Sequence, residues 1–341
     1  MNGKILIVDD DIDVRSGLQL LLRRQSYDVR TASDGTSALD VCVSFQPDLI
    51  LLDVMMPGRD GFAVCHEVKS RPETRLIPVI LITGLSDKSD RIRGIEAGAD
   101  DFLSKPIDLT ELDARVRSLL RLKSFTDELE NAEGVLFSLA LAIEARDPCT
   151  HGHCARLSDF SARLGERLGL PADEITALRR AGIVHDVGKV VVPDAVLLKP
   201  GPLTTEERLV MKQHPAVGER ICSPLKSFRS VLGIIRHHHE RWDGSGYPDG
   251  LRGETIPLTA RILQIADVYD ALTTQRPYRM ALAPGEAWKI LQEEVNRGWW
   301  EGNLVREFRE MMANRNFAAP MENRRGRPNF LVNAANGPRT K

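Results

Sequence analysis

The sequence predicts a multidomain protein: a doubly wound α/β domain with a five-stranded parallel sheet, then an all-α domain, joined by a long helix. Over residues 1–122, short apolar runs alternate with amphipathic stretches of helical length. This pattern is typical of a parallel sheet covered on both faces. From residue 109 the pattern turns helical, and residues 133–322 show no alternation of strands. The length of 341 residues is ordinary for two domains.

Composition excludes several classes of function. The net charge is -2 with 28% charged residues, so the chain has no overall electrostatic attraction to nucleic acid. No basic helix or helix-turn-helix follows the first domain, and we expect no DNA binding. No apolar run approaches the roughly 18 residues of a membrane span, and we expect no membrane insertion. The five cysteines are scattered without a C-x-x-C pair, which favours a reducing, cytoplasmic location.

The elements of the first domain follow from its apolar periodicity. The expected strands include KILIV, DLILLD, PVILIT and DFLSK, and the expected helices include residues 14–24, 36–45 and 88–97. Ligand sites in such sheets lie at the carboxyl ends of the strands. The polar residues at or just beyond those ends are Asp9, Asp10, Asp53, Thr83 and Lys105.

This set of polar residues favours a cation and phosphate site. Three carboxylates in one place repel each other unless a cation is bound, and oxygen ligands suit Mg2+. Asp53 is then a candidate nucleophile toward phosphate, with Lys105 neutralising the phosphoryl oxygens. A single acid would fit a merely solubilising role, but the whole set at matching strand ends does not.

The motifs IVDD, LLDVMMPGRDG, LITG and FLSKP resemble the receiver domain of bacterial two-component response regulators, over about residues 1–122. The resemblance implies Mg2+ held by Asp9, Asp10 and Asp53. It implies phosphorylation of Asp53 by a cognate sensor histidine kinase. It also implies that Thr83 and Phe102, beside Lys105, form the switch that reads the phosphate.

A heptad pattern marks the connecting helix, expected over about residues 109–145 with a linker at 123–132. Apolar residues step by three and four through Leu122, Phe125, Leu129, Ala132, Leu136, Leu139 and Ile143. This seam fits either an amphipathic helix packed on its own domain or a connector paired with its twin in a homodimer. Residues 323–341 carry five basic residues and no acid, which is typical of a disordered tail.

The predicted helical domain, residues 133–322, carries scattered metal-binding side chains. The candidates are His153, His185, Asp186, His214, His238, His239 and Asp267. Each adjacent pair, His185 with Asp186 and His238 with His239, can reach two metal ions from one segment. The carboxylate of Asp186 can bridge both ions. Mixed imidazole and carboxylate donors suit Fe or Mn, and two neighbouring ions promote phosphoester cleavage. Lys189, expected one helical turn after His185, and Arg276 and Arg279 are candidates for binding phosphate or substrate.

The motifs HDVGK, KPGPLTTEE, MKQH, HHERWDGSGYPDGL and ADVYDAL with QRPYR resemble the HD-GYP family of metal phosphohydrolases. The resemblance implies hydrolysis of cyclic di-GMP to pGpG, and in some members on to GMP, with Asp186 and Lys189 in catalytic roles. It also implies that a Gly-Tyr-Pro loop shapes the rim of the site and docks diguanylate cyclase domains. The residues of this loop are Asp243, Gly246, Tyr247 and Pro248.

Two features keep alternatives open. Some family members carry a glutamate four residues before the first histidine ligand and bind a third metal, but this chain has Cys149 there. We therefore predict a dinuclear site that stops largely at pGpG. We expect His237 to have a structural role. The alternative function is a signalling scaffold that binds partner proteins through the Gly-Tyr-Pro loop with little or no hydrolysis.

Overall fold

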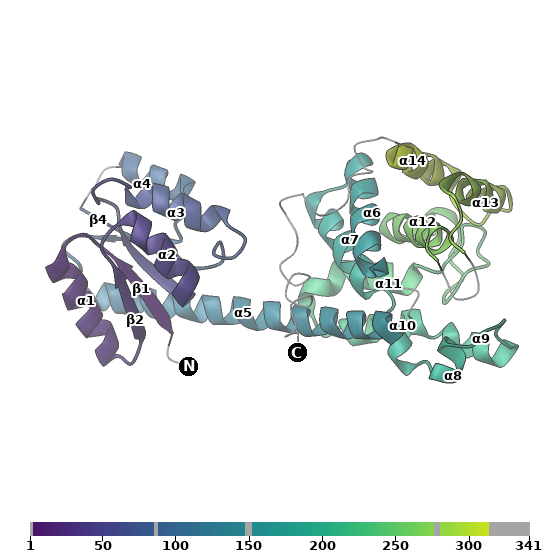
Figure 1. Cartoon of the computed structure of the whole chain (residues 1–341), viewed down its shortest axis with the longest axis horizontal. Coiled ribbons are helices and arrows are strands. Elements are labelled where there is room, and N and C mark those ends of the chain that lie inside the picture. The colour runs from purple at the N-terminus through teal and green to yellow at the C-terminus, as the bar shows by residue number, and fades with distance from the viewer. Residues whose placement is uncertain (1–2, 85–87, 147–151, 276–279, 314–341) are drawn as a thin grey trace, which may run out of the picture. The chain divides into compact units, whose positions relative to one another are not determined.

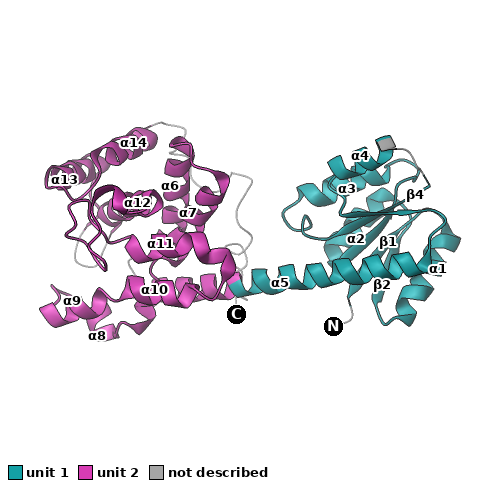
Figure 2. Cartoon of the chain, turned by 180° about the vertical axis from the view of Figure 1, so that it is seen from behind, with its two compact units in different colours: residues 1–132, 324–341 teal, residues 133–323 magenta. Residues whose placement is uncertain are grey.

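The computed structural model describes residues 3–84, 88–146, 152–275 and 280–313. The chain divides into two compact units, and the division falls between Ala132 and Glu133 in the sequence (Figure 2). The predicted tail at 323–341 lies outside the described residues. None of the helices in the described ranges is long and apolar enough to cross a membrane.

The N-terminal unit confirms the predicted parallel sheet. Its five strands lie in the order β2-β1-β3-β4-β5, and every neighbouring pair is parallel. The elements, in chain order, are β1 (Lys4–Val8), α1 (Ile12–Arg24), β2 (Asp28–Ala32), α2 (Gly35–Phe45), β3 (Leu49–Asp53), α3 (Gly61–Ser70), β4 (Val79–Thr83), α4 (Lys88–Glu96), β5 (Asp101–Ser104) and α5 (Leu109–Arg146). Figure 1 shows these helices around the sheet.

Burial explains why some strands could be predicted from apolar runs in the sequence and β2 could not. All five residues of β3 and of β4 are buried, because helices cover both faces of the sheet and demand a continuous apolar run. One core lies under α2 and α3, and the other lies under α1 and the start of α5. Strand β2 is at the edge and alternates between exposed and buried residues. Its sequence DVRTA therefore forms no apolar run.

The C-terminal unit consists of helices and loops and has no strand among its described residues, as predicted. After the end of α5 it comprises α6 (His153–Arg167), α7 (Ala172–Val184), η1 (Val187–Val191), α8 (Asp194–Leu197), α9 (Thr205–Met211), α10 (His214–Cys222), η2 (Lys226–Phe228), α11 (Arg229–His237), η3 (Gly253–Thr255), α12 (Leu258–Thr273), α13 (Pro284–Asn296) and α14 (Gly302–Ala313). The segments 193–202 and 243–257, which separate longer helices, each contain one short helical turn, α8 and η3. Turns of three or four residues are too short to give a periodic signal.

The heptad seam of α5 has two different environments. Leu136 and Ile143 are buried in the C-terminal unit, whereas Leu122 and Phe125 are 58% and 60% exposed. Phe137, next to the seam, lies against Phe228, with ring centroids 6.1 Å apart. The final part of the seam thus packs on its own domain, and the earlier part presents apolar side chains to solvent.

Candidate metal centres

The acidic cluster of the N-terminal unit forms where the sequence predicts it. Donor oxygens of Asp9, Asp10 and Asp53 all lie within 4.8 Å of one another. Asp9 follows β1 and Asp53 ends β3, so the cluster occupies the carboxyl ends of two adjacent strands. The side chain of Asp11 caps α1 by accepting hydrogen bonds from the backbone amides of Asp13 and Val14. This cap fixes the turn that carries Asp9 and Asp10.

The electrostatics of this cluster favour a bound cation. Nζ of Lys105 lies 3.1 Å from Oδ2 of Asp9 and 3.0 Å from Oδ2 of Asp53. Burial raises the pKa of Asp53, and the contact with Lys105 opposes that shift. Oδ1 of Asp53 is buried without a hydrogen-bond partner. A single lysine therefore leaves acceptor capacity that a divalent cation fits.

The two predicted switch residues lie close to this edge of the sheet. Thr83 ends β4 and is buried. Phe102 on β5 is partly buried against the core under α2 and α3. A Cβ on Gly94 of α4 would stand 2.4 Å from the Phe102 ring. The missing side chain of Gly94 therefore makes the space that the ring occupies.

The seven donors of the C-terminal unit gather into two groups. Within each group, the donor atoms lie within 4.8 Å of one another. The first group, which we call pocket A, is Asp186, His214, His238 and His239; the second, pocket B, is His153, His185 and Asp267. Six of these residues lie at helix ends or in loops and Asp267 lies inside α12, in segments far apart in the sequence, so the helical packing brings them together.

Asp186 links the two pockets. Its Oδ2 lies 3.3 Å from Nε2 of His185 in pocket B, and its Oδ1 lies 3.2 Å from Nε2 of His214 in pocket A. Oδ1 of Asp186 and both ring nitrogens of His185 are buried without hydrogen-bond partners. Unpartnered buried donors and acceptors are costly. A cation bound to Oδ1 of Asp186 and to the unprotonated nitrogen of His185 would remove much of this cost, so the residues present fit divalent metal ions.

Hydrogen bonds to backbone carbonyl groups fix the orientation of two histidine rings in pocket A. Nδ1 of His214 donates to the carbonyl oxygen of Met211 at 2.8 Å, and Nδ1 of His238 donates to that of Ile235 at 2.6 Å. Each ring therefore presents an unprotonated Nε2 to the centre. Burial lowers the pKa of His238 and of His239 well below the ordinary value, and neighbouring imidazoles add to the shift. Both rings are neutral near pH 7, as metal binding requires.

Lys189 reaches the centre by a different route from the one expected. It lies on the 3-10 helix η1 rather than one α-helical turn beyond His185, because α7 ends at Val184. Its Nζ lies 2.5 Å from Oδ2 of Asp186. Burial opposes the charge of Asp186, but Lys189 and His185 together hold its pKa well below the ordinary value. Gly188 permits this turn, since a Cβ there would stand 2.0 Å from the carbonyl oxygen of His214.

Hydrogen bonds to a buried side chain hold the Gly-Tyr-Pro loop beside the residues of pocket A. Glu240 is fully buried, and its carboxylate accepts hydrogen bonds from the backbone amides of Asp249, Gly250 and Leu251. A Cβ on Gly246 would stand 2.4 Å from Cα of Glu240. Asp243 caps the turn by accepting from the amide of Ser245. The loop therefore packs closely against Glu240, the residue that directly follows His238 and His239.

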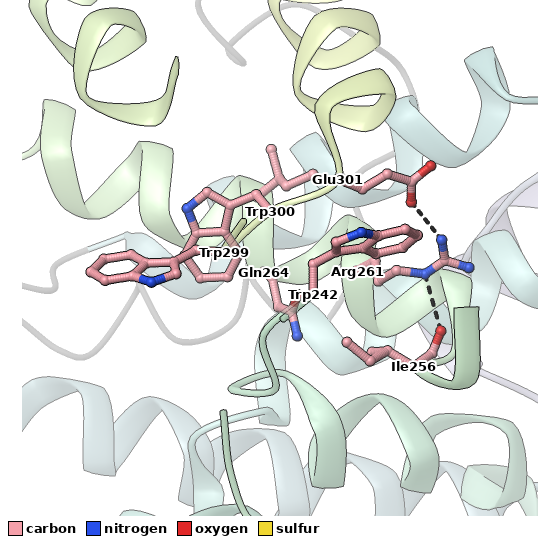
Figure 3. Close-up of a pocket in the computed structure, with 8 residues that line it drawn as sticks. Trp242, Ile256, Arg261, Gln264, Trp299, Trp300 and Glu301 are labelled. Carbon is pink, nitrogen blue, oxygen red and sulfur yellow. Dashed lines mark hydrogen bonds and ion pairs between the residues drawn. The ribbon is translucent and has the colours of Figure 1, made fainter. Parts of the chain in front are cut away.

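A pocket next to α12 is lined by Trp242, Trp299 and Trp300 (Figure 3). Three residues of the motif WWEGN, Trp299, Trp300 and Glu301, form part of its lining. Glu301 of this motif pairs with Arg261 of α12, the helix that carries Asp267. The guanidinium of Arg241 lies 3.7 Å from the ring centroid of Trp299. The WWEGN motif therefore packs against α12 and against Arg241, which lies just before the loop.

The predicted residues outside the two pockets have mixed positions. His237 makes a 3.0 Å contact from Nε2 to Oδ2 of Asp249 and belongs to neither pocket, in keeping with a structural role. Arg276, Arg279 and Cys149 lie outside the described residues. Sequence reasoning missed Asp270, which contacts the candidate ligand His153, Arg156, which contacts Asp270, and Glu240, which contacts the loop. The signal for Asp270 was its position three residues after Asp267, on the same helix face.

The fold and the two sites define a class: an α/β domain of the receiver type with an acidic cluster at its strand ends, followed by a helical domain with two groups of metal-binding side chains. Comparison with family models agrees. A response regulator receiver domain matches residues 5–117, and an HD domain matches residues 138–304.

Curated relatives narrow the class. The response regulator RpfG of Xanthomonas campestris, named as a cyclic di-GMP phosphodiesterase, is 40% identical over 309 residues, which cover 84% of this chain and 80% of that protein. A cyclic di-GMP phosphodiesterase of Thermotoga maritima is 35% identical, covering 84% and 85%. A 3'3'-cGAMP-specific phosphodiesterase of Vibrio cholerae is 35% identical, covering 63% and 42%. The chain belongs to the family of cyclic di-GMP phosphodiesterase response regulators.

Proposed function

We propose that this protein hydrolyses cyclic di-GMP to linear pGpG with two divalent ions, Fe or Mn, and that phosphorylation of Asp53 controls the reaction. One observation carries the proposal. The seven metal-binding side chains form two adjoining pockets that share Asp186, whose buried Oδ1 has no hydrogen-bond partner. The names of the relatives support the choice of substrate.

The residues of the centre have separable tasks. Ions held in pockets A and B would supply hydroxide near neutral pH and stabilise the attacking and leaving oxygens. Asp186, which lies between His185 and His214, would help to hold both ions. Lys189, in contact with Asp186 at 2.5 Å, would bind a phosphate oxygen. Arg276 and Arg279 are proposed to bind the substrate farther from the reacting phosphorus.

A small cavity adjoins the centre. A pocket beside Asp186 and His153 is lined by Lys189, Cys154 and Glu144. Burial raises the pKa of the Cys154 thiol far above its ordinary value, and the carboxylate of Glu144 adds to the shift. The thiol is therefore protonated near neutral pH and a poor nucleophile.

Helix α5 offers a route for control by phosphorylation. Its last residue, Arg146, donates from Nη2 to the carbonyl oxygen of Val192 at 3.2 Å and pairs with Asp194. These residues directly follow η1, the helix that carries Lys189. The same end of α5 contributes Glu144 to the pocket beside the centre. A shift of α5 on phosphorylation would therefore move the walls of the active site.

The proposed partners are the sensor kinase, diguanylate cyclase domains and a second copy of the chain. The outer edge of the Gly-Tyr-Pro loop is exposed at Ser245, Asp249 and Gly250, which supports docking of a cyclase domain. The exposed seam at Leu122, Phe125 and Leu129 supports a homodimer. Light scattering would test the dimer: Phe125→Glu should convert it to a monomer, and an unchanged mass would contradict this interface.

The deciding experiment measures hydrolysis by the full chain, purified without oxygen and supplied with Mn2+ or Fe2+. Cyclic di-GMP and 3'3'-cGAMP are compared, with products separated by HPLC. His185→Ala should abolish turnover, and His66→Ala, on the exposed face of α3, should not change it. GMP as the main early product would contradict the pGpG assignment. Absence of turnover with every metal would favour the scaffold function instead.

Control by phosphorylation is tested separately. Beryllofluoride, a mimic of the aspartyl phosphate, should change the rate for the wild-type chain and leave Asp53→Asn unaffected. Equal rates with and without the mimic in the wild-type chain would contradict control through Asp53.

A further inference from the structure

We propose that Asp270 is a positioning residue of the metal centre: it fixes the ring of His153 in pocket B, and Arg156 in turn fixes Asp270. This inference rests on the proposed two-ion centre. Neither residue belongs to the donor groups themselves.

The contact between Asp270 and His153 determines the tautomer of the ring. Oδ2 of Asp270 lies 2.7 Å from Nδ1 of His153. Asp270 is 3% exposed and His153 is 7% exposed, so water does not compete for this bond. An ionised carboxylate only accepts hydrogen bonds, and Nδ1 therefore carries the proton. The free lone pair is on Nε2, which lies 3.5 Å from Oδ1 of Asp267, another member of pocket B.

Arg156 holds the carboxylate of Asp270 in place. Its Nε donates to Oδ1 at 2.5 Å and its Nη2 donates to Oδ2 at 3.0 Å. The same Nη2 also donates to Oγ1 of Thr274 at 3.2 Å. A buried carboxylate is tolerated when its lone pairs are satisfied in this way, and a bidentate pair restricts its orientation.

The helical spacing makes this arrangement specific. His153 and Arg156 are three residues apart on α6, and Asp267 and Asp270 are three residues apart on α12. Each helix therefore contributes one donor of pocket B and one supporting residue on the same face. α6 and α12 pack against each other, so the support of His153 depends on the register between these two helices.

The two pockets differ in how their histidines are supported. In pocket A, His214 and His238 donate to backbone carbonyl oxygens, which no side-chain substitution removes. In pocket B, His153 depends on the side chain of Asp270. Loss of this carboxylate should therefore weaken one pocket and leave the other intact. Removal of such a supporting partner typically lowers metal affinity about 10- to 100-fold.

The test is equilibrium dialysis of the full chain against Mn2+ with elemental analysis. Excess Mg2+ is present to occupy the oxygen-only site of the receiver. The wild-type chain should bind two Mn2+ ions, and Asp270→Asn should keep one and bind the second with a Kd raised about 10- to 100-fold. Electron paramagnetic resonance should change from a coupled pair to a single Mn2+. The matched control is Asp159→Asn, which removes a 2.8 Å ion pair with Arg163 on the same helix and should keep both ions.

The outcomes separate this inference from the proposed centre. Two ions of unchanged affinity on Asp270→Asn would overturn it, as would loss of both ions together. Fewer than two ions on the wild-type chain would contradict the two-ion centre itself, and the inference with it. If Asp270→Asn does not fold, Arg156→Lys takes its place, because it keeps the charge and loses the bidentate contact. It should weaken the second ion only, and unchanged binding would overturn the inference.

Discussion

The ring of Tyr247 stacks on the imidazole of His239, with centroids 4.9 Å apart and an interplanar angle of 27°. The backbone joins the same two residues, since the amide of Tyr247 donates to the carbonyl oxygen of His239 at 3.1 Å. The tyrosine of the Gly-Tyr-Pro loop is thus a wall of pocket A. The loop supports a metal ligand as well as forming the rim of the site.

Substitution of Tyr247 should separate these roles. Tyr247→Ala removes the stacked ring, and we expect the Mn2+ affinity of pocket A to fall about fivefold, since aromatic pairs contribute about 1 kcal/mol. Tyr247→Phe keeps the ring and should bind Mn2+ like the wild-type chain. Equilibrium dialysis measures both variants. Equal affinity of the Ala and Phe variants would show that the ring does not support His239.

Glu240 should be important for the stability of the C-terminal unit. Glu240→Ala leaves three partly buried backbone amides without their acceptor, and we expect a loss of about 3 kcal/mol in the free energy of unfolding. Urea denaturation measures this loss. Glu254→Ala, at an exposed position on η3, is the control and should change stability by less than about 0.5 kcal/mol. A similar small change in Glu240→Ala would show that water satisfies the loop amides.

Acidification should empty the two pockets in order. Burial disfavours the charged form of His185, but the nearby carboxylate of Asp186 raises its pKa overall. Burial lowers the pKa of His238 and of His239. Protons bind neutral imidazole in competition with metal, and they do so at higher pH where the pKa is raised. As the pH falls, pocket B should therefore release its ion before pocket A.

Dialysis at stepped pH values from 8 to 5, with metal analysis at each step, would resolve this order. A plateau at one ion per chain is the expected result, and His238→Ala should remove it by emptying pocket A at the outset. Simultaneous release of both ions would contradict the difference between the pockets.

Gly188 should tolerate no side chain. A Cβ there would stand 2.0 Å from the carbonyl oxygen of His214 and 2.6 Å from the amide nitrogen of Gly218. Since both are backbone atoms, Gly188→Ala must push η1 away from α10, and we expect a loss of about 3 kcal/mol or more. Gly134→Ala on α5, where a Cβ meets nothing within 4 Å, is the matched control. It should raise stability by up to about 1 kcal/mol, and equal effects of the two substitutions would contradict the close contact.

The sequence by itself determined the class of each domain and the residues with chemistry. Strands β1, β3 and β4 were legible because burial on both faces requires continuous apolar runs. The strand-end acids Asp9 and Asp53 follow from the same pattern, because parallel strands bring their carboxyl ends to one edge of the sheet. The seven donors were recognisable as residue types, and the motifs around them are specific.

Only the tertiary structure decided how those donors are divided and supported. His153 and Asp270 are 117 positions apart, and no local pattern encodes the register of α6 against α12 that joins them. The structure also divides the heptad seam of α5. Its periodicity is the same throughout, but Leu136 meets the helices of its own domain and Leu122 does not. Local periodicity specifies which face of a helix is apolar, and packing between distant segments decides what covers that face.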